Sequence, residues 1–252
     1  MLERFSLDGR VAIVTGASSG LGVAFARGLA EAGADIVIGA RRKERLEETR
    51  RLVEETGRRC LALQTDVAVP EDCDALVAAA VAEFGAVDVL INNAGVGTAV
   101  PALRERPEEF RRVVEINLHG TYWMAQACAR VMRPGSSIVN VGSILGATTA
   151  GLPQAAYSAS KAAVAGLTRD LAQQWTARRG IRVNCLAPGF FASEMTEQYP
   201  PGYLESMLEL RVPMKRAGDP VELVAAAVFL AGDASSYVTG VTLPVDGGIL
   251  IT

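Results

Sequence analysis

Histidine and cysteine are scarce in this chain, and the scarcity excludes several kinds of site. Its 252 residues contain one histidine and four cysteines, at positions 60, 73, 128 and 185. The cysteines show no C-x-x-C spacing, so we expect no metal site. Scattered thiols with mostly apolar neighbours are typical of reduced core cysteines, which favours a cytoplasmic protein.

Long apolar runs and a large net charge are also missing. No run approaches the ~18 apolar residues that a membrane helix needs, and MLERFSLDGR at the start lacks the apolar region of a signal peptide. A net charge of −3 provides no field for gathering polyanions, which disfavours a dedicated nucleic-acid-binding protein. The length and composition predict one globular domain over residues 1–252.

A regular alternation of short apolar runs and longer helical patterns fills the chain. The runs are rich in β-branched residues, and the segments between them repeat apolar residues at i, i+3 and i+4 before ending at glycine. Nearly continuous apolar strands indicate a parallel sheet covered on both faces. We therefore predict an α/β fold of the Rossmann type, a doubly wound parallel seven-stranded sheet with helices on both faces. The predicted strands are 11–15, 34–40, 60–65, 87–92, 136–142, 181–187 and 241–245.

Two interpretations fit TGASSGLG (15–22), which follows the first predicted strand. Residues 16–20 match the G-x-S-x-G turn of serine hydrolases. That enzyme would need Ser18 to act with the single histidine, His119, and it would present the serine from a central strand rather than the first. The serine hydrolase is therefore kept as a remote alternative.

The second interpretation is a phosphate-binding turn. Gly16 permits the tight turn, Gly20 lets a pyrophosphate approach the backbone, and Gly22 allows close packing at the start of the helix. The hydroxyls of Ser18 and Ser19 and the positive end of the helix dipole add further attraction. We favour this interpretation because each residue type has a role.

The residues after the second strand distinguish between two dinucleotides. A carboxylate there would bind the ribose 2′-hydroxyl of NAD, whereas this chain carries Arg41 and Arg42. Guanidinium groups pair with a 2′-phosphate, so we predict that the protein binds NADP(H) rather than NAD(H). The alternative is that the two arginines only begin a solvated helix at 41–51. Asp66 and Val67, after the third strand, are expected to contact the adenine.

Further motifs follow in register along the whole chain. They are TGASSGLG (15–22), Asp66, NNAG (92–95), Asn117, Ser143, YSASK (157–161), Pro188-Gly189 and VTGVTLPVDGG (238–248). In these motifs the chain resembles the short-chain dehydrogenase/reductase family. The resemblance implies an NADPH-dependent reductase that transfers hydride between a nicotinamide and a ketone or secondary alcohol. The chain is also similar to 3-oxoacyl-(acyl-carrier-protein) reductases and to gluconate or glucose dehydrogenases, and both stay open.

The YSASK motif predicts the acid/base pair. Tyr157 and Lys161 are four residues apart in a predicted helix and leave the same face. A free phenol has a pKa of ~10, and an adjacent ammonium is expected to lower it, which would make Tyr157 a usable acid/base. The resemblance implies that Ser143 binds the substrate carbonyl, that Lys161 also holds the nicotinamide ribose, and that Asn117 anchors a water beside Lys161.

The resemblance also completes the set of cofactor contacts. It implies that Asn93 and Gly95 contact the adenosine side and that Pro188-Gly189 lies beside the nicotinamide. Ser193 stands where the family often has threonine, and Gly142 where many relatives have serine. The predicted cofactor contacts are Gly16, Ser18, Ser19, Gly20, Leu21, Arg41, Arg42, Asp66, Val67, Asn93, Gly95, Tyr157, Lys161, Pro188, Gly189, Phe191 and Ser193.

A segment at about 190–213 breaks the alternation and is typical of a substrate loop. It contains Pro200-Pro201-Gly202 and several aromatic residues. We expect a mostly apolar pocket and therefore a hydrophobic or aromatic ketone. The predicted lining is Ile144, Leu145, Leu152, Phe190, Phe191, Tyr199, Tyr203 and Met207.

Assembly is predicted from the faces of two helices. Small residues in YSASKAAVAGLT and TYWMAQACARVM suit close helix contacts, and the family commonly forms homotetramers. His119 is expected to pack within its helix. A carrier protein would dock on arginines at 130, 133, 178 and 179, which otherwise are solvated charges. A non-catalytic NADP-binding regulator is disfavoured because the four residues Asn117, Ser143, Tyr157 and Lys161 are all present.

Overall fold

The computed structural model describes residues 1–192 and 199–252, and its centre is a seven-stranded parallel sheet. All seven predicted strands are confirmed, with ends that move by at most two residues. They are β1 (Val11–Thr15), β2 (Asp35–Ala40), β3 (Cys60–Gln64), β4 (Val89–Asn92), β5 (Ser137–Val141), β6 (Arg182–Pro188) and β7 (Thr242–Val245). The order β3-β2-β1-β4-β5-β6-β7 reverses between β1 and β4, which opens a crevice at the carboxyl ends of these strands.

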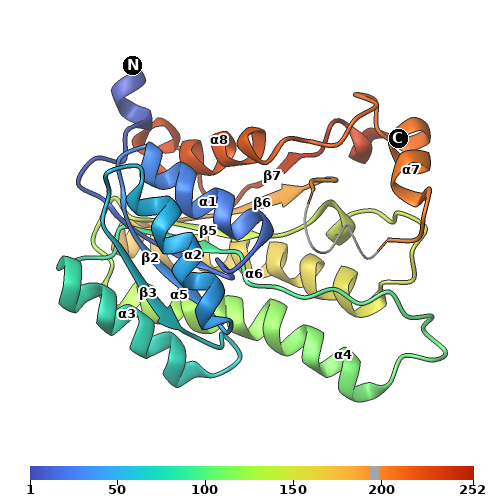
Figure 1. The fold of residues 1–252 in the computed structure, drawn as a ribbon, viewed down its shortest axis with the longest axis horizontal. Helices are drawn as coiled ribbons and strands as arrows, with labels where there is room; N and C mark the ends of the chain where they lie inside the picture. The colour runs from blue at the N-terminus through green and yellow to red at the C-terminus, as the bar shows by residue number, and fades with distance from the viewer. Residues whose placement is uncertain (193–198) are drawn as a thin grey trace.

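Helices cover both faces of the sheet, as the sequence predicts. Val14 and Ile91 point into one apolar cluster, and their neighbours Ile13 and Leu90 point into the other. The first cluster holds α1 (Gly20–Glu31), α2 (Lys43–Glu54) and α8 (Pro220–Ala231); the second holds α3 (Pro70–Phe84), α5 (Gly120–Val131) and α6 (Ala155–Arg179). In Figure 1, α8 lies above the strands, α1 and α2 pass in front of them, and α3 lies toward the lower side.

Helix ends carry the signals expected of them. Asp219 precedes α8, and its carboxylate accepts a hydrogen bond from the Val221 N–H at 2.9 Å. The Asp219 N–H donates in turn to the Glu222 carboxylate at 2.8 Å, which completes a capping box. The charged run at 41–51 lies largely in α2, where Arg50 pairs with Glu47 and Glu54, so its interpretation as a solvated helix face is confirmed. Within the described ranges, no helix has both the length and the apolarity needed to span a bilayer.

One long helix contains a π-helical segment that the sequence did not predict. α4 (Pro107–Val114) continues through η2 (Glu115–His119) into α5, and the Gly120 N–H donates to the Glu115 carbonyl, five residues back. Figure 1 shows α4 running on from α5 and away from the sheet. Such segments insert one extra residue into a helix and are frequent at functional sites. Asn117 lies in this one.

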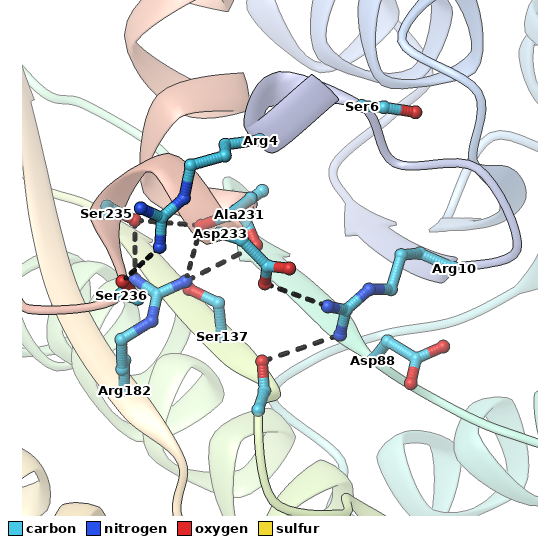
Figure 2. Close-up of polar contacts among 12 residues, drawn as sticks. Arg4, Ser6, Arg10, Asp88, Ser137, Arg182, Ala231, Asp233, Ser235 and Ser236 are labelled. Carbon is cyan, nitrogen blue, oxygen red and sulfur yellow. Dashed lines mark hydrogen bonds and ion pairs between the residues drawn. The ribbon is translucent and has the colours of Figure 1, made fainter. Parts of the chain in front are cut away.

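A second set of polar contacts ties together the opposite end of the sheet, where the strands begin (Figure 2). The guanidinium of Arg182, the first residue of β6, donates to the Leu230 carbonyl at 2.9 Å and the Gly232 carbonyl at 3.0 Å, at the end of α8. Arg10 pairs with Asp233 at 3.0 Å just beyond. Carbonyls at a helix end have no partner within the helix, so these donors stabilise the end of α8.

Candidate active site

A cleft of about 590 Å³ opens at the crevice that the strand order creates. Every described residue of the predicted cofactor set lines this cleft. Ser193 lies outside the described residues, and Asn117 does not line the cleft. The lining members are Gly16, Ser18, Ser19, Gly20, Leu21, Arg41, Arg42, Asp66, Val67, Asn93, Gly95, Tyr157, Lys161, Pro188, Gly189 and Phe191.

The turn between β1 and α1 forms a close-packed cradle. Gly16 has φ +66°, and a Cβ there would lie 2.7 Å from Ala94 Cα. A Cβ on Gly22 would lie 2.3 Å from the Gly16 carbonyl oxygen. The amide of Asn93 donates to the Thr15 carbonyl at 3.0 Å and holds the turn against the end of β4. Side chains are therefore excluded where the backbone N–H groups of α1 begin, which suits an anion.

Arg42 connects the second strand to this cradle. Its guanidinium donates to the Ser18 hydroxyl at 3.2 Å and to the Ser19 hydroxyl at 2.6 Å. Arg41 lies in the same wall of the cleft and is exposed. This end of the cleft therefore gathers two guanidinium groups and two hydroxyls, a set of donors that matches a phosphate.

The same geometry argues against a hydrolase centred on Ser18. The single histidine, His119, does not line the cleft, and its ring nitrogen bonds the Glu115 carboxylate at 2.8 Å on the helix surface. Its side chain is 47% exposed, but it also contacts the Trp123 ring at 6.3 Å between centroids, so His119 packs along its own helix as predicted. A guanidinium beside Ser18 is a poor base, because arginine keeps its proton.

Asn117 connects three elements from within the π-helical segment. Its amide oxygen accepts from the Val96 N–H at 2.8 Å, and its amide nitrogen donates to the Val96 carbonyl at 2.9 Å and the Ser160 hydroxyl at 3.0 Å. Ser160 donates in turn to the Tyr157 carbonyl at 2.7 Å. The fully buried Asn117 side chain thus fixes the loop after β4 relative to the helix that carries Tyr157.

Tyr157 and Lys161 lie together in α6 at the inner end of the cleft. Both are buried, and the Lys161 ammonium lies 5.8 Å from the centre of the Tyr157 ring. Lys161 Nζ donates to the Val141 carbonyl, at the end of β5, at 2.7 Å. Burial lowers the pKa of Lys161 to about 8, although the Cys185 thiol opposes this shift.

The pKa of Tyr157 shifts in the direction opposite to the one predicted. Burial raises it to about 12, the Ser143 hydroxyl lowers it in part, and Tyr199 raises it further. The predicted lowering of the Tyr157 pKa is therefore wrong for this structure, because removal of the phenol from water outweighs its hydrogen bond with Ser143. A phenol with this pKa keeps its proton near neutral pH and is poised as a donor.

The substrate end of the cleft is mostly apolar, and α7 (Tyr203–Arg211) lies beside it. The sequence predicted a loop there and did not predict this helix. Leu152, Tyr203 and Met207 do not line the cleft, although Tyr203 and Met207 pack on the apolar cluster behind it. The predicted residues that do line it are Ile144, Leu145, Phe190, Phe191 and Tyr199.

Sequence reasoning missed the contribution of α4. Glu109, Arg112 and Val113 line the cleft from this helix. No motif in the sequence marks these three residues, and the π-helical segment at 115–119 shifts the register between them and Asn117. Within the described ranges, no three His, Cys, Asp or Glu side chains gather as metal ligands.

The glycine at position 142, directly before Ser143, is explained by its close packing against Cys185. A Cβ at this position would lie 2.6 Å from the Cys185 sulfur, which is far below a normal contact. The buried thiol therefore occupies the space that a serine side chain would need. No expectation had been drawn for this departure from the resemblance.

Comparisons with known proteins match the whole chain. The family model described as enoyl-(acyl carrier protein) reductase matches residues 16–250. The chain is 42% identical to 2-dehydro-3-deoxy-D-gluconate 5-dehydrogenase of Dickeya dadantii over 99% of both chains, and 37% identical to 3-oxoacyl-(acyl-carrier-protein) reductase of Vibrio cholerae over 97% of this chain and 98% of that one. A crystal structure of a gluconate 5-dehydrogenase from Burkholderia cenocepacia, in complex with NADP and tartrate, superposes with a TM-score of 0.92 at 37% identity and covers 100% of this chain and 99% of its own.

Proposed function

The chain belongs to the short-chain dehydrogenase/reductase family, and from this premise we propose that it is an NADPH-dependent reductase of ketones. One observation carries the proposal: Ser143, Tyr157 and Lys161 line the same cleft as the glycine-rich cradle. The nicotinamide would supply hydride to the carbonyl carbon or take it back from the alcohol. The reverse oxidation uses the same residues.

The cleft fits the dinucleotide. The cradle at Gly16 and Gly22 leaves room that a Cβ would fill, and α1 directs the positive end of its dipole there. Arg41 and Arg42 would pair with the 2′-phosphate, and Asp66 and the other lining residues would hold the adenosine and nicotinamide portions. The NADP complex of the Burkholderia relative supports this assignment.

We assign three roles at the reacting carbonyl. Tyr157 donates its phenolic proton to the carbonyl oxygen, and Ser143 donates a hydrogen bond to the same atom. The ammonium of Lys161 stabilises the phenolate that remains. Asn117 acts as a positioning residue through its bonds to Val96 and Ser160.

The leading substrate class is a hydrophobic or aromatic ketone, because Ile144, Leu145 and Phe190 form apolar walls. A sugar-acid substrate finds no polar partner in these three side chains, although Glu109 and Arg112 of α4 also line the cleft. The carrier-protein alternative also loses support, since Arg130 is paired with Asp74 at 2.9 Å and Arg133 contacts Asp88 at 3.5 Å. The names of the Dickeya and Vibrio relatives keep both alternatives in the substrate panel.

We further propose one domain over residues 1–252, a homotetramer and a cytoplasmic location. The faces of α5 and α6 leave Trp123 and Gly166 only partly buried, which suits contact between helices of neighbouring subunits. All four cysteines are free thiols, as suits a reducing compartment. Sedimentation equilibrium tests the assembly.

The Tyr157→Phe variant tests the reaction. NADPH and NADH oxidation are followed with β-ketoesters, aryl ketones, diketones and sugar acids, and Tyr237→Phe, at a fully exposed position, is the control. We expect kcat to fall roughly 10²–10⁴-fold in Tyr157→Phe alone, since proton donation is lost. A Tyr157→Phe protein that turns over ketones normally would overturn the mechanism, and NADPH binding without any turnover would favour the non-catalytic regulator.

The cofactor preference has its own variant. Replacing Arg42 by alanine removes a donor to the 2′-phosphate, so we expect the NADPH Kd to rise about 10-fold or more while that of NADH changes little. Fluorescence titration measures both constants. A wild-type preference for NADH would contradict the assignment of Arg41 and Arg42.

A further inference from the structure

Two tyrosines beside the substrate end of the cleft are held in different ways. The Tyr203 hydroxyl donates to the Ala150 carbonyl, so it has a partner within the fold. The ring of Tyr199 packs edge-on against Tyr203 at 5.1 Å and against Phe190 at 6.3 Å between centroids. Across residues 1–192 and 199–252, the Tyr199 hydroxyl has no hydrogen-bond partner. Two aromatic contacts thus orient the ring while its polar end is left available.

Tyr199 also lies beside the proposed reaction centre. It lines the same cleft as Ser143 and Tyr157, and it packs on the apolar cluster that contains Tyr157. It is close enough to Tyr157 to raise the pKa of that phenol. Burial raises the pKa of Tyr199 itself, so its hydroxyl stays protonated and is a hydrogen-bond donor.

A half-buried donor among apolar walls selects for an acceptor once a ligand covers it. Ile144, Leu145 and Phe190 supply no side-chain hydrogen bond there. A ligand that covers the Tyr199 hydroxyl without a matching oxygen would cut this donor off from water and leave it unpaired, which is unfavourable. A ligand with an oxygen at that point would satisfy it, and sites built this way discriminate strongly against analogues that lack the group.

We propose that Tyr199 is a specificity-determining residue whose hydroxyl donates a hydrogen bond to a second oxygen of the substrate, near the carbonyl that is reduced. The inference rests on the proposed reductase function. The preferred substrate is then an apolar ketone with a carbonyl, ester or hydroxyl oxygen close to the reacting carbon. Tyr203 has a different role, because its hydroxyl is engaged by Ala150 and it supports the ring of Tyr199.

A pair of isosteric ketones tests the proposal. Ethyl acetoacetate carries an ester carbonyl that 2-heptanone lacks, while the chain length is the same. In Tyr199→Phe, which keeps the ring contacts, we expect kcat/KM for the ester to fall about 10-fold and that for 2-heptanone to change less than about 2-fold. Tyr203→Phe is the matched control and should change both substrates by the same factor. Equal losses on both ketones in Tyr199→Phe, or no loss on either, would overturn the proposal.

A binding measurement separates this proposal from the reductase function. In a Tyr157→Phe background with NADP+, Kd values for the ester and for 2-heptanone are measured by NMR titration, with and without Tyr199→Phe. We expect the second substitution to weaken the ester about 10-fold and leave 2-heptanone unchanged. Unchanged Kd values for both would overturn the role of Tyr199. If the wild-type protein reduces neither ketone but Tyr199→Phe still weakens binding of the ester alone, the role of Tyr199 in binding is supported and the reductase function is rejected.

Discussion

Two buried cations at opposite ends of the sheet are held in contrasting ways. Arg182, at the start of β6, is 7% exposed and makes four hydrogen bonds, to three successive carbonyls at the end of α8 (230–232) and to the Ser235 hydroxyl. Lys161 is 5% exposed and donates to one carbonyl, that of Val141 at the end of β5. Their burial is nearly equal, so the difference lies in their partners.

The contrast shows how one fold separates stability from chemistry. Burial lowers the pKa of Arg182 as well, but a guanidinium starts from a much higher pKa and keeps its proton, and four hydrogen bonds fix its position. A buried cation with few partners has a pKa moved toward neutrality, and Lys161 reaches about 8. Such perturbed groups cluster at functional sites, because their environment is arranged for reactivity rather than for the stability of the fold.

Replacing each cation by methionine tests the contrast most directly, and the largest effect is expected for Arg182. We expect Arg182→Met to lower the free energy of unfolding by about 3–5 kcal/mol, because carbonyls at the end of α8 lose their buried donor. Urea denaturation measures the change. Arg4→Met is the control, since Arg4 bonds Ser236 at 3.1 Å from an exposed position nearby. A loss below about 1 kcal/mol would contradict the structural role.

Lys161→Met should act with the opposite sign on stability. At pH 7 the buried ammonium is unfavourable by roughly 3 kcal/mol, since its pKa falls from 10.5 to about 8 and each unit is worth about 1.4 kcal/mol. We therefore expect a gain in stability of up to about this size, together with a loss of turnover of roughly 100-fold or more. Lys43→Met, on the exposed start of α2, is the control. A destabilised Lys161→Met protein would show that the ammonium supports the fold.

The pH dependence of that gain sharpens the comparison. Between about pH 8 and 10.5 the unfolded chain binds a proton at Lys161 that the folded chain has released, so wild-type stability rises through this window relative to Lys161→Met. The stability difference between the two proteins is expected to be constant below pH 8 and to vanish near pH 10.5. Thermal melts at intervals of pH measure it. A difference that does not change with pH would mean that Lys161 titrates normally.

The smallest expected effect concerns the packing of Gly142 against Cys185, the thiol that influences the pKa of Lys161. Gly142→Ser places a side chain 2.6 Å from the Cys185 sulfur, so we expect a loss of about 1–3 kcal/mol from overpacking. Cys185→Ala in the same chain should recover most of that loss, and the double-mutant cycle measures the coupling. Additive effects of the two substitutions would place the clash elsewhere.

The seven strands and the cofactor cleft were predictable because local signals define them. Apolar runs ended by glycine marked β1 and its neighbours, and a parallel sheet then brought the carboxyl ends of those strands to one edge. The motifs at 15–22 and 157–161 therefore met in the cleft although they are far apart in sequence. Their individual roles in catalysis stay proposals.

Features that depend on burial or on packing were not predictable in the same way. The spacing of Tyr157 and Lys161 showed that they share a helix face, but it did not show that burial dominates the pKa of the phenol. The segment YLESMLELR at 203–211 contains good helix formers, yet the prolines before it favoured a loop. His119 is half-exposed in the π-helical segment, which the sequence did not predict.

That segment, η2, also affects how the protein can tolerate changes in length. One extra residue lets α4 and α5 share an axis while presenting different faces, one toward the cleft and one toward the sheet. Deleting a single residue at 115–119 would restore ordinary helical register and rotate all of α4 by roughly 100° relative to α5. The cleft-facing side chains of α4 would then turn away together, so the width of this one turn sets the outer wall of the cleft.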